Sequence, residues 1–328
     1  MDLAPGRSFV EWAVDHGHTV FAISYRNPDA TMRDVTLDAY LLEGPRIALD
    51  VIGEITGAPQ VNIVGLCLGG TLTTMLLAYL EATGDQRVAS ATLLNTLVDF
   101  SEPGVLGAFT DEASIARLER KMARHGYLEG AEMATTFDLL RAGDLVWNYV
   151  VSNWLLGEDP PAFDILAWNA DSTRMPAAMH SFYLRSCYLE NQLAQSRMEL
   201  AGVRLDLDAV TCDVYLVGAQ ADHITPWRSS YTTTQLLKGD VRFVLSSSGH
   251  IAGIVNPPSP KARHWTGGAT PPDPDAWLAH ATEHQGSWWE DWAEWAKGKA
   301  GQRREAPRMG SDAHPPLADA PGAYVRER

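Results

Sequence analysis

The chain has 328 residues, of which 45% are hydrophobic and 20% charged, and this composition excludes an intrinsically disordered protein. The 26 lysines and arginines against 41 aspartates and glutamates give a net charge of −15, which argues against a general nucleic-acid binder. Three cysteines, Cys67, Cys187 and Cys212, are too few for a disulfide framework and too far apart for a zinc knuckle, so we expect a reducing cytoplasm.

The first hundred residues alternate between helical and strand patterns. We predict a helix over residues 9–16, a strand over 19–25 and a turn at 26–29. Hydrophobic residues at helical spacing then predict a helix over 37–56. Strands at 61–64 and 89–94 enclose a helix at 71–83. Strands that alternate with helices predict a parallel sheet with helical crossovers.

Residues 61–80 contain no charged side chain over a length that could span a bilayer. Asn62, three glycines and three threonines interrupt the stretch, which favours a buried strand, a tight turn and a buried helix. The N-terminus has no basic stretch followed by an apolar one, so it is not a secretory signal. We therefore expect neither a signal sequence nor a transmembrane segment.

Helical patterns dominate residues 101–200, which we interpret as a helical cap inserted into an α/β domain. Strands resume at 214–217 and 241–245, before a Pro- and Gly-rich loop at 257–274, a helix at 288–299 and a polar tail at 303–328. The expected organisation is core 1–100, cap 101–200, core 201–300 and tail 301–328. Four tryptophans recur at helical spacing, which favours core packing over an exposed apolar patch: Trp288, Trp289, Trp292 and Trp295.

The segment Gly65-Leu66-Cys67-Leu68-Gly69 lies between a predicted strand and a predicted helix. A G-x-nucleophile-x-G turn in this context is typical of the nucleophile elbow of α/β-hydrolase folds, here with cysteine where serine is usual. We expect side chains larger than hydrogen at either glycine to collide. The helix start favours a thiolate, and the N–H of Leu68 is a candidate oxyanion donor. The alternative is a buried structural cysteine in a glycine-containing turn.

Two candidate partners follow in the order acid, then base. Asp222 ends the segment after strand 214–217, and His250 lies in the loop after strand 241–245. Because functional groups collect at the carboxyl ends of parallel strands, we expect both on the same side of the sheet as Cys67. His250 would take the thiol proton and Asp222 would orient the imidazole. His223 is a weaker candidate for support, and the other histidines show no metal-ligand spacing, so we expect no metal.

Ordered motifs along nearly the whole chain resemble the class I polyhydroxyalkanoate synthases, a family of polyester polymerases. The matching segments are VFAISYRNPD (20–29), GLCLGGT (65–71), NWLLG (153–157), FDILAWN (163–169), YLR (183–185), YLEN (188–191), DHITPW (222–227), SSGHIAG (247–253) and WWEDW (288–292).

The resemblance implies an α/β-hydrolase core with a mostly parallel sheet, an inserted cap and a Cys67–His250–Asp222 site. It implies an acyltransferase that polymerises (R)-3-hydroxyacyl-CoA through a Cys-bound acyl intermediate, in which Asp222 and His250 also activate the hydroxyl of the incoming monomer. CoA is then part of the substrate, and no separate cofactor is expected. The implied partners are the growing polyester chain, a second copy in a homodimer and the surface of a cytoplasmic polyester granule.

Other residues are candidates for binding the substrate, on less specific sequence signals. Arg185 and Asn27 fall in family motifs and are candidates for lining the substrate route. Four arginines could bind the phosphates of CoA, although each alone is more often a surface or ion-paired residue: Arg26, Arg33, Arg185 and Arg228.

Compared with the family, an early core strand is missing before residue 1, and we expect a truncated gene model or a fragment. The sheet would then have an unpaired edge. The second oxyanion N–H would also be missing, and one such donor is worth about a hundredfold in rate. Two alternatives to a polymerase stay open. One is a thioesterase or depolymerase on the same site, and the other is an inactive truncated partner that binds granules or a full-length subunit.

Overall fold

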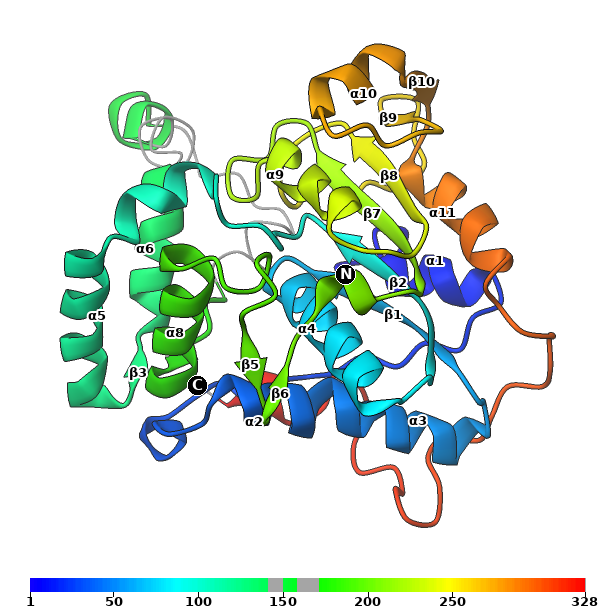
Figure 1. Cartoon of the computed structure of the whole chain (residues 1–328), viewed down its shortest axis with the longest axis horizontal. Coiled ribbons are helices and arrows are strands. Elements are labelled where there is room, and N and C mark those ends of the chain that lie inside the picture. Colours follow the sequence, from blue (N-terminus) through cyan, green and yellow to red (C-terminus); the bar gives the residue numbers. More distant parts are fainter. Residues whose placement is uncertain (141–149, 158–170, 328) are drawn as a thin grey trace.

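The computed structural model describes residues 1–140, 150–157 and 171–327. Its centre is a six-stranded sheet with the order β1-β2-β7-β8-β9-β10 (Figure 1). Four neighbouring strands are parallel: β1 (Val61–Leu66), β2 (Val88–Leu94), β7 (Asp213–Ala219) and β8 (Val241–Ser246). Two antiparallel strands extend the sheet beyond β8: β9 (Arg263–Thr266) and β10 (Thr282–Gln285). The prediction of a mostly parallel α/β sheet is confirmed.

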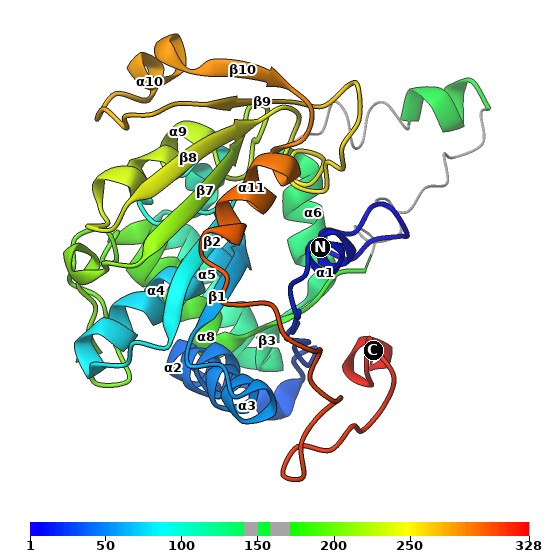
Figure 2. The ribbon, with the colours of Figure 1, turned by 90° about the vertical axis from the view of Figure 1, so that its right-hand side faces the viewer.

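Helices cover both faces of this sheet, so most residues of its central strands β2, β7 and β8 are buried. Helix α4 (Leu68–Thr83) packs on one face, in a hydrophobic core that also includes Val214 and Leu216 of β7. Helices α1 (Phe9–Asp15) and α11 (Trp288–Lys297) pack on the other, against Tyr215 and Val217 (Figure 2). Successive residues of one strand therefore belong to two different hydrophobic cores, as the alternation of side chains along a strand requires.

The tryptophans of α11 form the centre of the second core. Trp288, Trp289 and Trp292 are at most 5% exposed and surround Phe9 with ring centroids 4.7–5.3 Å away. The predicted core packing is confirmed for these three side chains. Two of the indoles also donate hydrogen bonds of 2.9 Å to the carbonyls of Gly253 and Ile254. The packing of α11 thereby holds the segment that follows His250.

The predicted strand at residues 19–25 is wrong. The segment forms no strand, and its side chains Phe21, Ile23 and Tyr25 are 40–48% exposed. Strand β1 pairs with β2 alone among the described residues and is the edge of the sheet, with Val64 43% exposed. Branched and aromatic residues favour an extended backbone, but a strand also needs a neighbour for its hydrogen bonds. The expected unpaired edge is thus present at β1.

Two other predicted elements differ in the structure. The helix over 37–56 breaks into α2 (Leu37–Leu41), a π-helical segment (Leu42–Arg46) and α3 (Ile47–Thr56). The break lies at Gly44, whose backbone is not helical because Pro45 follows it. The loop prediction for 257–274 is wrong at β9, whose residues pair with β8 and β10. The sequence there has no long run of strand-forming residues that would predict a strand.

Short elements and helices dominate residues 101–200, and α5, α6 and α8 stand beside the sheet (Figure 1). The helices there are α5 (Glu112–His125), α6 (Gly130–Leu140), α8 (Ala177–Tyr183), the 3₁₀ segment Gly104–Phe109 and the π-helical segments Val150–Leu155 and Leu184–Leu189. The strands are β3 (Tyr127–Leu128), β4 (Met175–Pro176) and β5 (Glu199–Leu200). Motif 163–169 lies outside the described residues, and the domain limits at 100, 200 and 300 stay a prediction.

The remaining elements are β6 (Val203–Arg204), α9 (Trp227–Tyr231), α10 (Pro274–His280) and the 3₁₀ segments Ala30–Met32, Leu207–Ala209, Thr232–Gln235 and Tyr324–Arg326. Residues 61–80 form a strand, a tight turn and a helix, as predicted. In the described part of the chain, no helix combines the length and the hydropathy that crossing a membrane requires.

Candidate active site

Cys67 occupies the turn between β1 and α4, where the backbone adopts φ 52° and ψ −121°. Few non-glycine residues adopt this conformation, which is costly unless the surrounding fold enforces it. Here the Cys67 N–H donates to the Leu94 carbonyl of β2 at 2.9 Å, and the Cys67 carbonyl caps the start of α4. The predicted nucleophile elbow is present. Leu68 begins α4, and N–H groups in a first helical turn have no acceptor within their own helix.

The glycines of the elbow are needed at different positions from those expected. A Cβ at Gly65 would lie 2.6 Å from the Gly69 carbonyl oxygen and 2.6 Å from Thr73 Oγ1, so a side chain does collide there. A Cβ at Gly69 would meet nothing within 4 Å, and the expectation of a collision at that residue is wrong. The second crowded position is Gly70, where a Cβ would lie 1.9 Å from Thr96 Oγ1. Close approach of β1, α4 and the end of β2 causes both restrictions.

His250 and Asp222 meet beside Cys67. His250 Nδ1 lies 2.7 Å from Asp222 Oδ2, and their side chains are 9% and 0% exposed. The Cys67 thiol lies close enough to His250 to favour its charged form. The structure therefore brings together the three side chains predicted from separate strand ends, and a hydrogen bond joins two of them, His250 and Asp222.

The loop after β7 holds Asp222 in place. The backbone N–H groups of Ile224 and Thr225 donate to Asp222 Oδ1 at 2.8 and 3.0 Å, and Thr225 Oγ1 donates to Oδ2 at 2.7 Å. The sequence analysis did not single out Thr225. A hydroxyl three residues after an aspartate is a common turn pattern, and no local signal distinguishes this one.

The charges of the pair support each other. Burial opposes ionisation of Asp222, but the hydrogen bonds from His250 and Thr225 outweigh it and lower the pKa of Asp222. Burial also opposes the charged form of His250, but the hydrogen bond to Asp222 and the interaction with Cys67 outweigh it and raise the pKa of His250 to about 10. An imidazolium is therefore stable at this position at neutral pH. This is the state in which His250 has accepted a proton from a thiol.

Two tyrosines border the site, and the sequence analysis assigned neither of them a role. Tyr183 and Tyr188 are five residues apart, and the π-helical turn over Leu184–Leu189 sets their rings edge to face with centroids 5.5 Å apart. Both rings also contact Phe100 edge to face. Burial raises the pKa of both phenols, and the nearby Cys67 raises both further. With Phe100 these side chains form an aromatic wall near enough to Cys67 for its charge to affect both phenols.

The other candidate residues have partners within the chain. Arg185 forms a two-pronged ion pair with Glu119 at 2.7 and 2.8 Å and a third bond to Glu112. Asn27 Oδ1 accepts from the backbone N–H of Arg174 at 2.9 Å. Their predicted roles in substrate binding stay predictions, as does support by the half-buried His223.

The arginines proposed for CoA phosphates are also engaged. Arg26 pairs with Asp29 and Glu327, Arg228 pairs with Asp275, and Arg33 donates to the carbonyl of Ala123.

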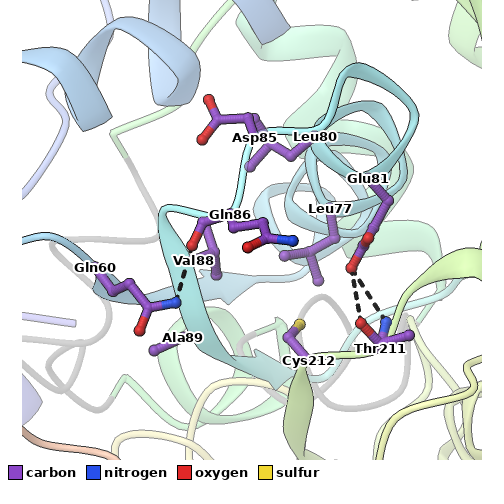
Figure 3. Close-up of a pocket in the computed structure, with 10 residues that line it drawn as sticks. All are labelled: Gln60, Leu77, Leu80, Glu81, Asp85, Gln86, Val88, Ala89, Thr211 and Cys212. Carbon is purple, nitrogen blue, oxygen red and sulfur yellow. Dashed lines mark hydrogen bonds between the residues drawn. The ribbon is translucent and has the colours of Figure 1, made fainter.

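Two pockets differ in their relation to this site. One of about 260 Å³ is bordered by Asp222 and also by Glu102, Gln220, Trp227 and Arg228. The other, about 240 Å³, lies at the amino ends of β1, β2 and β7 (Figure 3), whereas Cys67 follows the carboxyl end of β1. Cys212 lines this second pocket, and burial together with the charges of Glu81 and Asp213 raises its pKa to about 11.

The pKa values of the two other cysteines, Cys187 and Cys212, are both raised. Burial raises the pKa of Cys187, which is fully buried, whereas Cys212 is only half-buried. A thiol with a raised pKa carries little thiolate at neutral pH and is a poor nucleophile. No cluster of three or more potential metal ligands occurs among the described residues.

A family model described as the alpha/beta hydrolase fold matches residues 7–257. The chain belongs to this family. The family places a nucleophile on a strand-to-helix turn, which is where Cys67 lies.

Curated relatives match over almost the entire chain. A poly(3-hydroxyalkanoate) polymerase of Methylorubrum extorquens is 50% identical over 99% of this chain and 54% of its own length. The poly(3-hydroxyalkanoate) polymerase subunit PhaC of Rhizobium meliloti is 48% identical over 100% of the chain and 54% of its own length. The corresponding subunit of Cupriavidus necator is 44% identical over 100% of this chain and 57% of its own length. The chain spans about half the length of the curated relatives it matches.

Proposed function

We propose that this chain carries the catalytic site of a polyhydroxyalkanoate synthase, which polymerises (R)-3-hydroxyacyl-CoA into polyester and releases CoA. The observation that carries the proposal is the arrangement of a half-buried Cys67 on a strained elbow beside the buried His250–Asp222 pair. The likeness to polymerases at 44–50% identity supports the choice of substrate. We also propose that the protein acts as a homodimer at the surface of cytoplasmic polyester granules, which rests on the family resemblance.

In the first step His250 takes the Cys67 proton and the sulfur attacks the thioester carbonyl of the substrate. The carbon–sulfur bond to CoA breaks, and the CoA thiolate takes the proton back from His250. One thioester is exchanged for another, so this step is close to isoenergetic, and the acyl-enzyme is not a trap. Cysteine suits this exchange better than serine, which would form a more stable oxygen ester.

In the second step a hydroxyl group attacks the Cys67 thioester. His250 accepts the hydroxyl proton and returns it to the Cys67 sulfur as the new ester forms. Asp222 stabilises the imidazolium in both steps through the 2.7 Å hydrogen bond. Water competes with the hydroxyl, and the helices of residues 101–200 and the tyrosine wall beside Cys67 would limit its access.

The experiment is incubation of the purified chain with (R)-3-hydroxybutyryl-CoA, with CoA release, free acid and polymer measured together. We expect CoA release accompanied by polymer, and we expect Cys67→Ala to abolish both. Cys212→Ala is the matched control because its thiol lies in the distant pocket, and it should retain the wild-type rate.

Two outcomes would contradict the proposal. Release of free acid without polymer would assign the site to a thioesterase or depolymerase. Absence of CoA release from both wild type and Cys67→Ala would leave the chain as an inactive partner of a granule or of a longer subunit.

A further inference from the structure

Asn95 joins the three segments that carry the reacting side chains. It follows the end of β2, and its N–H donates to the Val217 carbonyl of β7, the strand that leads to Asp222, at 2.8 Å. The preceding carbonyl, of Leu94, accepts from the N–H of Cys67 at 2.9 Å. The side chain completes the connection, because Asn95 Nδ2 donates to the backbone carbonyl of His250 at 2.6 Å. Sequence reasoning assigned this residue no role.

This placement of Asn95 is costly. The residue is fully buried, and its φ of 43° lies in the left-handed region that side chains other than glycine rarely adopt. Asparagine tolerates that region better than most residues, which accounts for the residue type. Its Oδ1 accepts no hydrogen bond from the residues that the structure describes. Backbone strain and buried polar atoms of this kind concentrate at functional sites.

The bond to His250 bears on catalysis through geometry. His250 lies in a loop, and its ring must keep contact with Asp222 on one side and Cys67 on the other. The Trp288 and Trp289 indoles hold the segment just after it, at Gly253 and Ile254. The Asn95 amide acts on the His250 peptide itself and ties it to the end of β2.

We propose that Asn95 is a positioning residue of the reaction, which fixes the His250 backbone so that the imidazole spans Asp222 and Cys67. The inference rests on the proposed function for its catalytic meaning. Asn95 touches no reacting atom and acts only through His250. The same bond also links the segment of His250 to the segment whose Leu94 carbonyl orients Cys67, so its loss changes the distance between base and nucleophile.

The test uses two substitutions at residue 95. Asn95→Gly keeps the left-handed backbone accessible and deletes the amide donor. Asn95→Asp keeps the shape but faces the His250 carbonyl with an acceptor in place of a donor. Tyr231→Phe is the matched control, because it deletes a buried side-chain donor to a backbone carbonyl, that of Pro271 at 2.6 Å, away from the site.

The first readout is the rate at which iodoacetamide alkylates Cys67 across pH 5–10, measured by mass spectrometry on the peptide that contains it. We expect both Asn95 variants to react about 10- to 100-fold more slowly at pH 7, since small misplacements of a base have effects of this size. Their pH profiles should move to higher pH, and Tyr231→Phe should match wild type. The second readout is CoA release, where kcat should fall while KM changes little.

Wild-type alkylation rates and pH profiles in both variants would overturn the proposal. Failure of both variants to fold, by circular dichroism, would also overturn it and assign Asn95 a purely structural role. His250→Gln separates this inference from the proposed function. If His250→Gln itself alkylates like wild type, the proposed Cys67–His250 chemistry fails. If His250→Gln is slow and the Asn95 variants are not, the positioning role alone fails.

Discussion

Replacing Asp222 with asparagine tests whether His250 is a base because of its partner. Asparagine has nearly the same shape, and its oxygen can still accept from the N–H groups of Ile224 and Thr225. Its amide nitrogen then replaces Oδ2 and faces His250 Nδ1, 2.7 Å away in the wild type. A donor at that position requires Nδ1 to accept, which places the ring proton on Nε2. The ring nitrogen that should accept the thiol proton is then occupied.

The size of the effect follows from burial. The Asp222 side chain is fully buried and that of His250 is 9% exposed, so solvent screens their interaction little. Removing one partner of a buried charged pair costs about 3 to 5 kcal/mol. At 1.36 kcal/mol per decade this predicts about a 10²- to 10⁴-fold loss of the reactive form. The pKa of His250, raised to about 10 in the wild type, should fall in Asp222→Asn, because burial still opposes the charged imidazole and only Cys67 remains to support it.

The assay is alkylation of Cys67 by iodoacetamide as a function of pH, together with the rate of CoA release. We expect alkylation of Cys67 at pH 7 and the release of CoA both to slow in Asp222→Asn. Asp275→Asn is the control, because that carboxylate is exposed and its ion pair with Arg228 is worth at most about 1 kcal/mol. An unchanged alkylation profile in Asp222→Asn would refute the assignment of Asp222 as the partner of His250.

Three further predictions concern stability. Gly65→Ala should lower the free energy of unfolding, measured in urea, by about 1 to 3 kcal/mol, because the added Cβ overpacks the elbow. Gly69→Ala is its control and should lower the free energy of unfolding by less than about 0.5 kcal/mol, because its Cβ would enter open space. Equal losses in the two variants would contradict the elbow geometry. Trp289→Ala should cost about 3 to 5 kcal/mol in the same assay, and a loss below about 1 kcal/mol would contradict its place in the core. The folded-state pKa of His250 is raised, so the stability that it gains from Asp222 is complete below about pH 6.5 and is lost as pH rises toward 10. The stability difference between wild type and Asp222→Asn should therefore shrink over that interval, and an increase would contradict the sign.

The sequence was sufficient to single out the three candidate residues that the structure brings together, Cys67, Asp222 and His250. A cysteine between glycines, after a strand and before a helix, specifies the elbow, because the turn depends on residues close together in the chain. Asp222 and His250 follow strands that the hydrophobic pattern also reveals, and parallel strands place their carboxyl ends together. Helical spacing likewise predicted the buried face of α11.

Tertiary structure decided the features that depend on contacts between distant segments. Residues 19–25 have the composition of a strand but pair with no neighbouring strand. Strand β9 pairs with β8 and β10 although its sequence is not typical of a strand. The crowding at Gly70 comes from Thr96, and the partner of Arg185 is Glu119 on another helix. Asn95 is the clearest example. Its left-handed backbone and its bond to His250, 155 positions away, exist only because β1, β2 and β7 end side by side. Local patterns encode local conformation, whereas hydrogen-bond partners and steric limits arise from segments that meet only in the folded chain.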